Sequence, residues 1–230
     1  MPPDPDRHLV IARLREEIRR IERSPARREG RVASGLAGVD AALPGGGFPR
    51  GALSELSGGP ASGKTAVALA LVAGLGREEL AAWVDGRGEL YPPAAAAHGV
   101  DLGRLLVVRP SGAGAGRPEP SGAGSVRPGL WAAEALLASG AFASVVVDLP
   151  IAARLPGADA AGRRLQAAAE RGGAVGLWLS PGDGLRIPAA VRVEIAIEGG
   201  GRAAHAPGGA RIVARPLRSS GPRGGGSRVA

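Results

Sequence analysis

Short runs of Val, Leu and Ala alternate along the chain with segments whose apolar residues recur at helical spacing. The strand-like runs lie at residues 52–56, 81–85, 105–109, 144–148 and 174–180, with a closing pair at 191–198 and 210–218. The intervening segments predict helices at 66–76, 92–100, 129–140 and 161–171, and a short helix before a glycine-rich turn within 35–49. This order predicts an α/β fold, in which helices flank a mostly parallel sheet.

A further helix is predicted before the alternating region, over residues 8–23. Ile11, Leu14, Ile18 and Ile21 recur at helical spacing and form a narrow apolar seam. The seam has two interpretations: the helix packs on its own domain, or it docks on a partner or on a neighbouring copy of the chain. The expected organisation is an N-terminal helix and linker at 1–33, a core at 34–218 and a tail at 219–230.

Positive charge is concentrated toward the end of the chain. The formal net charge is +8, and the segment from Gly199 onward contains six arginines and no acidic residue. Its basic, glycine-rich composition predicts a disordered tail at 219–230, and the Gly- and Pro-rich stretch at 110–128 predicts a flexible loop. The alternative interpretation of the tail is contact with nucleic acid, for which charge alone supplies no sequence specificity.

Composition excludes several kinds of site. The chain has no cysteine, which excludes disulfides, thiolate metal sites and a cysteine nucleophile. Only 3% of the residues are aromatic, and Trp83 and Trp178 lie inside strand-like runs, where we expect core positions. No apolar run is long enough to span a bilayer, and the N-terminus lacks a signal-peptide pattern, so we expect a cytoplasmic protein without membrane contact.

A motif with specific chemistry follows the first core strand. Gly58, Gly63, Lys64 and Thr65 satisfy the pattern G-x-x-x-x-G-K-[ST], a phosphate-binding loop at the start of a helix. Glycines let backbone N–H groups surround an anion, and the N-terminus of the helix faces the same point. Lys64 is the only lysine among 29 basic residues, and Thr65 is the only threonine. The predicted nucleotide-binding residues of this loop are Gly58, Gly59, Pro60, Ala61, Ser62, Gly63, Lys64 and Thr65.

A second element indicates the same chemistry. The run SVVVD at 144–148 predicts a buried strand that ends in Asp148, and ligands of parallel sheets bind at the carboxyl ends of strands. A carboxylate at that place holds Mg²⁺ or its water shell beside the phosphates. Thr65 and Asp148 are therefore the predicted metal ligands, and ATP with Mg²⁺ is the predicted cofactor.

The order of these pieces resembles RecA-type recombinases. The resemblance lies in SGLAGVDAALPGGGFPRGALSELSGGPASGKT, WVDGRGELYPPAAAAHGVDLGRLLVVRP, LLASGAFASVVVDLP and AAVRVEIAI. Within that superfamily, D-x-x-L-P-G-G-G at Asp40 to Gly47, RLLVVRP followed by LWAAEALLASG, and RRLQAAAERGGAVGLWLSP are similar to the ImuA family, RecA-like accessory proteins of a bacterial mutagenesis cassette. The resemblance implies a RecA-like P-loop core that binds ATP.

The similarity to the ImuA family also implies a cellular role. That family acts in the SOS response to DNA damage, in translesion synthesis by a Y-family-like polymerase homologue and an error-prone replicative-type polymerase. The implied partners are these two polymerases and RecA, with DNA contacted indirectly. Self-association through the N-terminal helix is an expectation from the apolar seam alone, and it is one of the two interpretations of that seam. The implied location is the cytoplasm, at the nucleoid during DNA damage.

Several positions depart from the RecA pattern. Arg87 stands where RecA has its catalytic glutamate, which leaves Glu89 as the candidate catalytic residue. Ser180 stands at the place of the glutamine that senses the γ-phosphate, and the segments matching the DNA-binding loops are short, so strand exchange is not expected. Tyr91 lies near the segment that covers adenine in RecA, where it either stacks on the base or packs at a helix start.

These departures define two hypotheses from different classes. The first and favoured one is an ATP-binding accessory protein that recruits or regulates error-prone polymerases and hydrolyses ATP weakly or not at all. The second is a minimal DNA-dependent ATPase of the RecA/RadA type with Glu89 as its base. A small-molecule P-loop kinase is disfavoured, because the sequence has no evident substrate-binding lid.

Overall fold

The computed structural model describes residues 30–110, 126–150, 158–181, 188–198 and 211–216. The predicted helix over 8–23, most of the predicted loop over 110–128 and the predicted tail over 219–230 lie outside the described residues.

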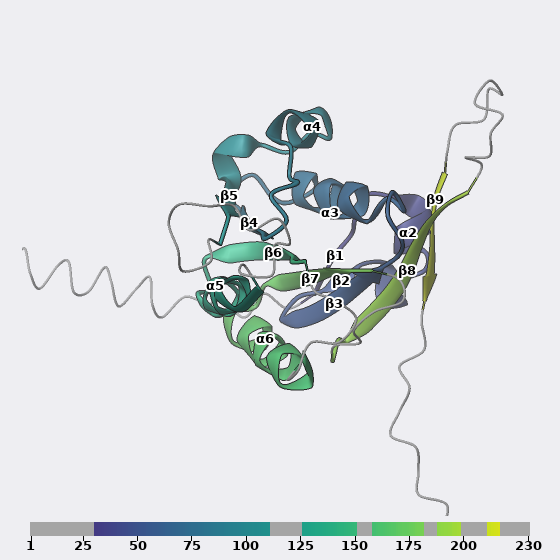
Figure 1. Cartoon of the computed structure of the whole chain (residues 1–230). Helices are drawn as coiled ribbons and strands as arrows, with labels where there is room; N and C mark the ends of the chain where they lie inside the picture. The colour runs from purple at the N-terminus through teal and green to yellow at the C-terminus, as the bar shows by residue number, and fades with distance from the viewer. Residues whose placement is uncertain (1–29, 111–125, 151–157, 182–187, 199–210, 217–230) are drawn as a thin grey trace, which may run out of the picture.

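A seven-stranded sheet forms the centre of the described structure (Figure 1). Its strands lie in the order β5-β4-β6-β7-β3-β8-β9, and neighbours are parallel except for the antiparallel pair β8 and β9. The predicted mostly parallel α/β fold is thereby confirmed. The strands are β3 (Ala52–Ser57), β4 (Leu80–Asp85), β5 (Leu105–Val108), β6 (Phe142–Asp148), β7 (Val175–Ser180), β8 (Val191–Glu198) and β9 (Arg211–Pro216).

Helices cover the two faces of this sheet (Figure 1). The helices α3 (Lys64–Ala73) and α4 (Pro92–Ala97) lie on one face, and α5 (Val126–Ala138) and α6 (Ala158–Gly172) lie on the other. The short helix α2 (Ala37–Asp40) lies near β9. Two 3₁₀ turns complete the described helical elements, η1 (Pro44–Gly46) and η2 (Leu102–Arg104).

The core consists of two apolar clusters, one on each face of the sheet. In β4, Ala81 and Trp83 belong to the cluster under α3, whereas Ala82 and Val84 belong to the cluster under α5 and α6. This alternation follows from the period of two in a β-strand, and burial on both faces explains why the strands are almost continuously apolar. Trp83 is 0% exposed and Trp178 is 3% exposed, which confirms the predicted core positions of these two residues.

Two local features differ from the sequence-based expectation. The helix predicted from Gly129 already includes Val126, so the loop predicted over 110–128 extends three residues too far. The loop was predicted from the Gly- and Pro-rich composition of the segment, which ends at Pro128, yet the first turn of a helix tolerates proline because its N–H groups have no helical acceptor. The ribbon of β1 (Arg31–Val32) and β2 (Phe48–Pro49) was also missed, because two-residue strands carry no periodic signal.

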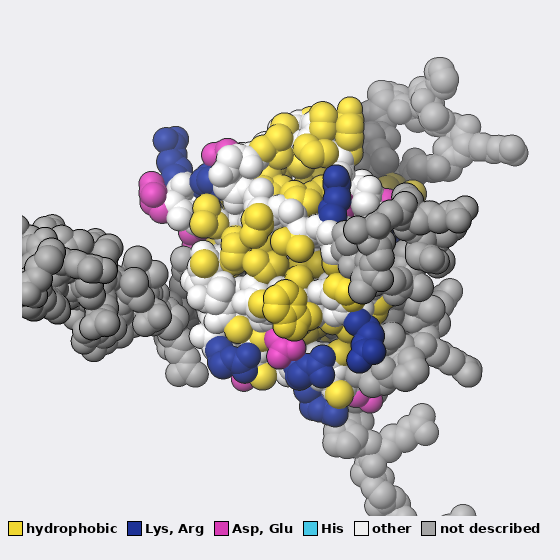
Figure 2. All heavy atoms as spheres, turned by 60° about the vertical axis from the view of Figure 1, so that its left-hand side comes forward, with side chains coloured by type: hydrophobic (Ala, Val, Ile, Leu, Met, Phe, Trp, Pro, Cys, Tyr) yellow, Lys and Arg dark blue, Asp and Glu magenta, His cyan; other side chains and the backbone are white. Residues whose placement is uncertain are grey.

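Some large apolar side chains lie on the surface. Figure 2 shows hydrophobic side chains gathered on the face that forms the left-hand side of Figure 1. Trp131 is 74% exposed on α5, and Leu106 is 45% exposed on the edge strand β5. Gathered apolar side chains on a surface are typical of protein contacts. Within the described residues, no helix has the length and apolar character to cross a bilayer.

Candidate functional site

The loop between β3 and α3 has a tightly curled backbone. Gly63 has φ of 93°, and Ala61, with φ of 56°, is the sole non-glycine residue with positive φ in the described part of the chain. A Cβ on Gly58 would lie 2.5 Å from the carbonyl oxygen of Ile195, and one on Gly63 would lie 3.3 Å from the Cδ1 atom of Ile212. The loop therefore needs glycine at both ends, and its curled backbone at a helix N-terminus is the arrangement that binds phosphate.

Lys64 folds back over this loop. Its Nζ atom donates hydrogen bonds to the carbonyl oxygens of Gly58 and Gly59, the second at 2.9 Å, and to the hydroxyl of Ser62 at 3.3 Å. Thr65, the next residue in α3, is exposed. An ammonium held by neutral acceptors at the mouth of the loop is positioned to exchange them for the oxygens of an anion.

Asp148 ends β6 next to the end of β4, and the two strands are in register at Asp85 and Asp148. The N–H of Gly86 donates to the carbonyl oxygen of Asp148 at 2.8 Å, and Arg87 Nε donates to Asp148 Oδ1 at 2.9 Å. The side chain of Asp148 is 13% exposed and that of Arg87 is 32% exposed. The carboxylate therefore faces the arginine rather than bulk water.

Burial raises the pKa of Asp148 to about 6, because the charged form loses hydration. Arg87 opposes this shift, while the negative charges of Asp85 and Glu89 add to it. Burial also lowers the pKa of Lys64; Asp148 counteracts that effect, and Arg87 adds to it. Lys64, Arg87 and Asp148 thus lie close enough to act on one another electrostatically.

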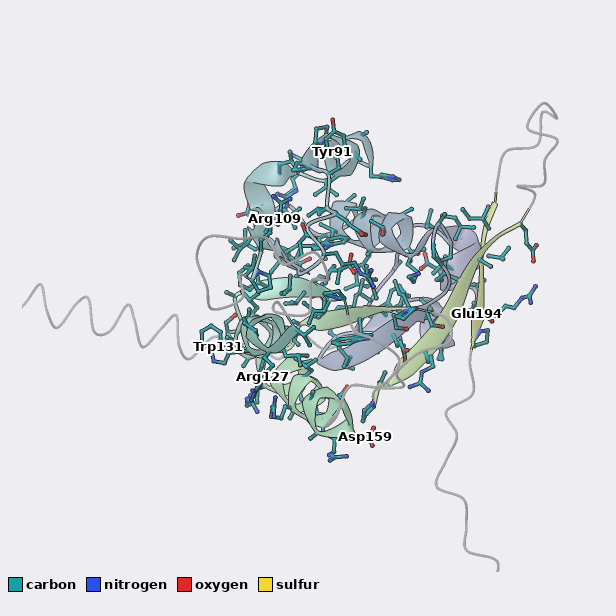
Figure 3. All side chains as sticks on the ribbon, in the orientation of Figure 1. Tyr91, Arg109, Arg127, Trp131, Asp159 and Glu194 are labelled. Carbon is teal, nitrogen blue, oxygen red and sulfur yellow. The ribbon has the colours of Figure 1, made fainter. Side chains whose placement is uncertain are left out.

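Asp85 holds the turn that carries Arg87. Its fully buried carboxylate accepts hydrogen bonds from the backbone N–H of Glu89 at 3.0 Å and of Leu90 at 3.3 Å, and from Arg109 Nε at 3.0 Å. Arg109, labelled in Figure 3, also donates to the carbonyl oxygen of Leu90 at 3.1 Å. Sequence reasoning assigned no role to Asp85 or Arg109, although an aspartate directly before a glycine-rich turn is a common signal of such closure.

A buried polar cluster lies below the phosphate-binding loop. Glu55, in β3 between β7 and β8, accepts a hydrogen bond from the Ser180 hydroxyl at 2.7 Å and another from Arg192 Nε. The carbonyl oxygen of Ser180 accepts from the N–H of Gly58 at 3.3 Å. The cluster joins the adjacent strands β7, β3 and β8, and it was not predicted from the sequence. Ser180 thus directs its hydroxyl to Glu55 within the sheet.

The remaining predicted site residues are exposed. Tyr91 is 65% exposed and precedes α4 as its N-cap residue, at the outer edge of the molecule in Figure 3. Glu89 is exposed, and its backbone rather than its carboxylate is held by Asp85. The structure therefore brings together Lys64 and Asp148, and adds Arg87 to them.

The residues at this site fit a polyphosphate with a loosely held metal. Among the described residues no group of three or more His, Cys, Asp and Glu side chains could hold a metal ion by itself. The hydroxyl of Thr65 and the carboxylate of Asp148 are hard oxygen donors of the kind that Mg²⁺ takes when phosphates and waters supply its other ligands. The carboxylate of Asp148, however, already carries the guanidinium of Arg87.

The comparison with known families agrees with this geometry. The profile of the RecA N-terminal domain matches residues 15–171. The chain belongs to the RecA family. The match to that family includes the phosphate-binding loop, Arg87 and Asp148, whereas β7, β8 and β9 lie beyond it.

Individual RecA proteins show the same relationship. The chain is 39% identical to protein RecA of Lactobacillus delbrueckii subsp. bulgaricus over 132 residues, which are 57% of this chain and 36% of that protein. It is 40% identical to protein RecA of Limosilactobacillus reuteri over 129 residues, 56% of this chain and 32% of that protein. With protein RecA of Lactococcus lactis subsp. cremoris it shares 38% identity over 129 residues, 56% of this chain and 30% of that protein. The matched part thus spans about a third of these RecA proteins.

Proposed function

We propose that this RecA-family chain is an ATP-binding accessory protein of the DNA damage response, which recruits or regulates error-prone polymerases in translesion synthesis. In this proposal it hydrolyses ATP weakly or not at all and performs no strand exchange. One observation carries it: the phosphate-binding loop is complete around Lys64, yet the cation Arg87 lies on Asp148 where a hydrolytic site needs a base.

The loop and α3 supply the binding groups for ATP. Backbone N–H groups of the curled loop and the positive end of α3 face the phosphates. Lys64 turns its N–H groups from the carbonyl oxygens of Gly58 and Gly59 to the terminal phosphate. The hydroxyl of Thr65 would ligate Mg²⁺ bound with ATP, while the carboxylate of Asp148 already bonds Arg87.

The turn after β4 supports weak hydrolysis. A positively charged guanidinium does not accept a proton from water, so Arg87 cannot be a general base. Glu89 is the alternative base, and its negative charge acts on Asp148. A minimal DNA-dependent ATPase that uses Glu89 is therefore the competing function. Release of phosphate from ATP, measured with and without single-stranded DNA, decides between the two functions. Release no faster than that of Lys64→Ala supports the accessory protein. Release that DNA stimulates and that Glu89→Gln abolishes supports the ATPase.

Thermal unfolding with Mg-ATP tests the nucleotide site itself. At about a hundred times Kd, ATP adds about 2.7 kcal/mol of stability, which raises the Tm by several degrees for a chain of this size. Lys64→Ala should abolish the shift, whereas Arg164→Gln, at an ion pair with Glu134 between α5 and α6, should retain it. Absence of a shift in the wild-type protein would refute the proposed binding of ATP.

The proposed partners are the two polymerases of the mutagenesis cassette and RecA. The exposed apolar side chains, among them Trp131 and Leu106, support a role in protein contacts. The apolar seam at Ile11–Ile21 is the proposed docking helix, and it lies outside the described residues. Leu14→Asp with Ile18→Asp should abolish pull-down of the polymerase homologue. Arg20→Asp, on the opposite side of the predicted helix, should not. Unchanged pull-down after the seam substitutions would remove this helix from the proposal.

A further inference from the structure

The pair of Arg87 and Asp148 is more than a surface ion pair. The backbones at its base are joined by the hydrogen bond from Gly86 to Asp148, and the turn that follows is closed by the fully buried Asp85. Exposed Arg–carboxylate pairs are mobile and contribute little, but here the carboxylate is only 13% exposed and the backbone under the arginine is fixed. Arg87 is therefore preorganised on Asp148.

The charges at the mouth of the loop favour an anion without a metal. Lys64 and Arg87 are positive and Asp148 is negative, so the three side chains carry a net positive charge when all are ionised. With Arg87 absent, Lys64 and Asp148 would cancel, and a polyphosphate would approach a neutral site. In that case a divalent cation would be needed to offset the charge of Asp148.

The chemistry of the two cations also favours Arg87 at this carboxylate. Mg²⁺ sheds its water reluctantly and requires near-octahedral geometry, whereas a guanidinium is weakly hydrated and bonds directly to carboxylate and phosphate oxygens. Arg87 donates to Asp148 through its Nε atom, so the two terminal nitrogens of the guanidinium are the donors that would bind a phosphate.

We propose that Arg87 takes the place of the divalent cation at Asp148, so that this chain binds a nucleoside triphosphate with little dependence on Mg²⁺. This inference rests on the proposed function, since it concerns the nucleotide held by the loop at Lys64. Arg87 is then a ligand-binding residue that bridges Asp148 and the terminal phosphate, and Mg²⁺ adds little to the affinity.

The test measures the Kd of ATP by titration calorimetry on the full chain, in Mg²⁺ and in EDTA. For the wild-type protein we expect the two values to agree within about threefold. Arg87→Gln should weaken binding in EDTA by about tenfold or more, the effect of one lost charge-assisted contact, and Mg²⁺ should then restore it. Arg87→Lys, which keeps the charge, should bind without Mg²⁺ better than Arg87→Gln does.

Controls separate this inference from the proposed function. Arg164→Gln removes an Arg–carboxylate pair with the same Nε geometry away from the loop and should behave as the wild-type protein. Two results would overturn the role of Arg87 and leave ATP binding intact. In the first, ATP binding by the wild-type protein depends on Mg²⁺ as strongly as binding by Arg87→Gln does. In the second, Arg87→Lys binds ATP in EDTA as weakly as Arg87→Gln does. Absence of ATP binding in Mg²⁺ and in EDTA would refute both.

Discussion

Replacement of Asp148 by asparagine should stabilise the nucleotide-free protein near neutral pH and do so much less in acid. The pKa of Asp148 is raised from 3.8 to about 6, mainly by burial. The ion pair with Arg87 would by itself lower this pKa, but burial outweighs it, with help from Asp85 and Glu89. The folded state therefore binds the proton of Asp148 more tightly than the unfolded chain does. The stability that this provides is present below pH 3.8 and is lost as the pH rises through about 6.

The shift fixes the size of the effect. A difference of about two pKa units corresponds to about 3 kcal/mol when the pH is well above both values. Between about pH 4.5 and about pH 7.5 the linkage relation gives a change of about 2 kcal/mol, since part of the penalty is already present at the lower pH. The difference in Tm between Asp148→Asn and the wild-type protein should therefore grow by roughly 6 °C over that range, in favour of the variant.

The assay compares thermal or urea unfolding of the two proteins at matched ionic strength across this pH range. Other acids titrate in both proteins, so the difference between them isolates Asp148. The exposed Asp159, labelled on α6 in Figure 3, offers a matched control, because Asp159→Asn removes the same charge without relieving burial. A difference between Asp148→Asn and wild type that stays constant with pH, or one that grows equally for Asp159→Asn, would refute the reasoning.

Two further substitutions test how the site is supported. Gly172→Ala should lower the free energy of unfolding in urea by about 1–3 kcal/mol. A Cβ on Gly172 would lie 1.9 Å from the carbonyl oxygen of Leu137 and would push α6 from α5. Gly38→Ala is the control: its Cβ would lie 3.5 Å from the nearest atom, so it should cost less than a third as much. Glu55→Gln should cost about 3 kcal/mol, since it takes the negative charge away from the mostly buried guanidinium of Arg192, whereas Glu198→Gln, at an exposed ion pair, should cost less than about 1 kcal/mol. Equal effects would contradict the importance of burial.

Local patterns account for what the sequence predicted well. The central strands are buried on both faces of the sheet, so their sequences are continuous Val- and Ala-rich runs. These runs predicted β4, β6 and β7 within two residues of their observed starts. The phosphate-binding loop was predictable because its glycines, its lysine and its helix are contiguous in sequence. The start of α5 was missed because the prediction extended the Gly- and Pro-rich loop through Pro128, although the first turn of a helix accepts proline.

The partners of the charged groups were not predictable, because strand order decides them. Arg87 and Asp148 are 61 residues apart and meet only because β4 and β6 are neighbours with their carboxyl ends in register. Glu55 and Arg192, 137 residues apart, meet because β8 adds beside β3. In a chain whose basic residues are arginine everywhere except Lys64, residue type does not mark the arginine that matters. The strand order distinguishes the two arginines near Asp85. Arg109 follows β5, at the edge of the sheet, and pairs with Asp85. Arg87 follows β4 and pairs with Asp148, the carboxylate beside the phosphate-binding loop.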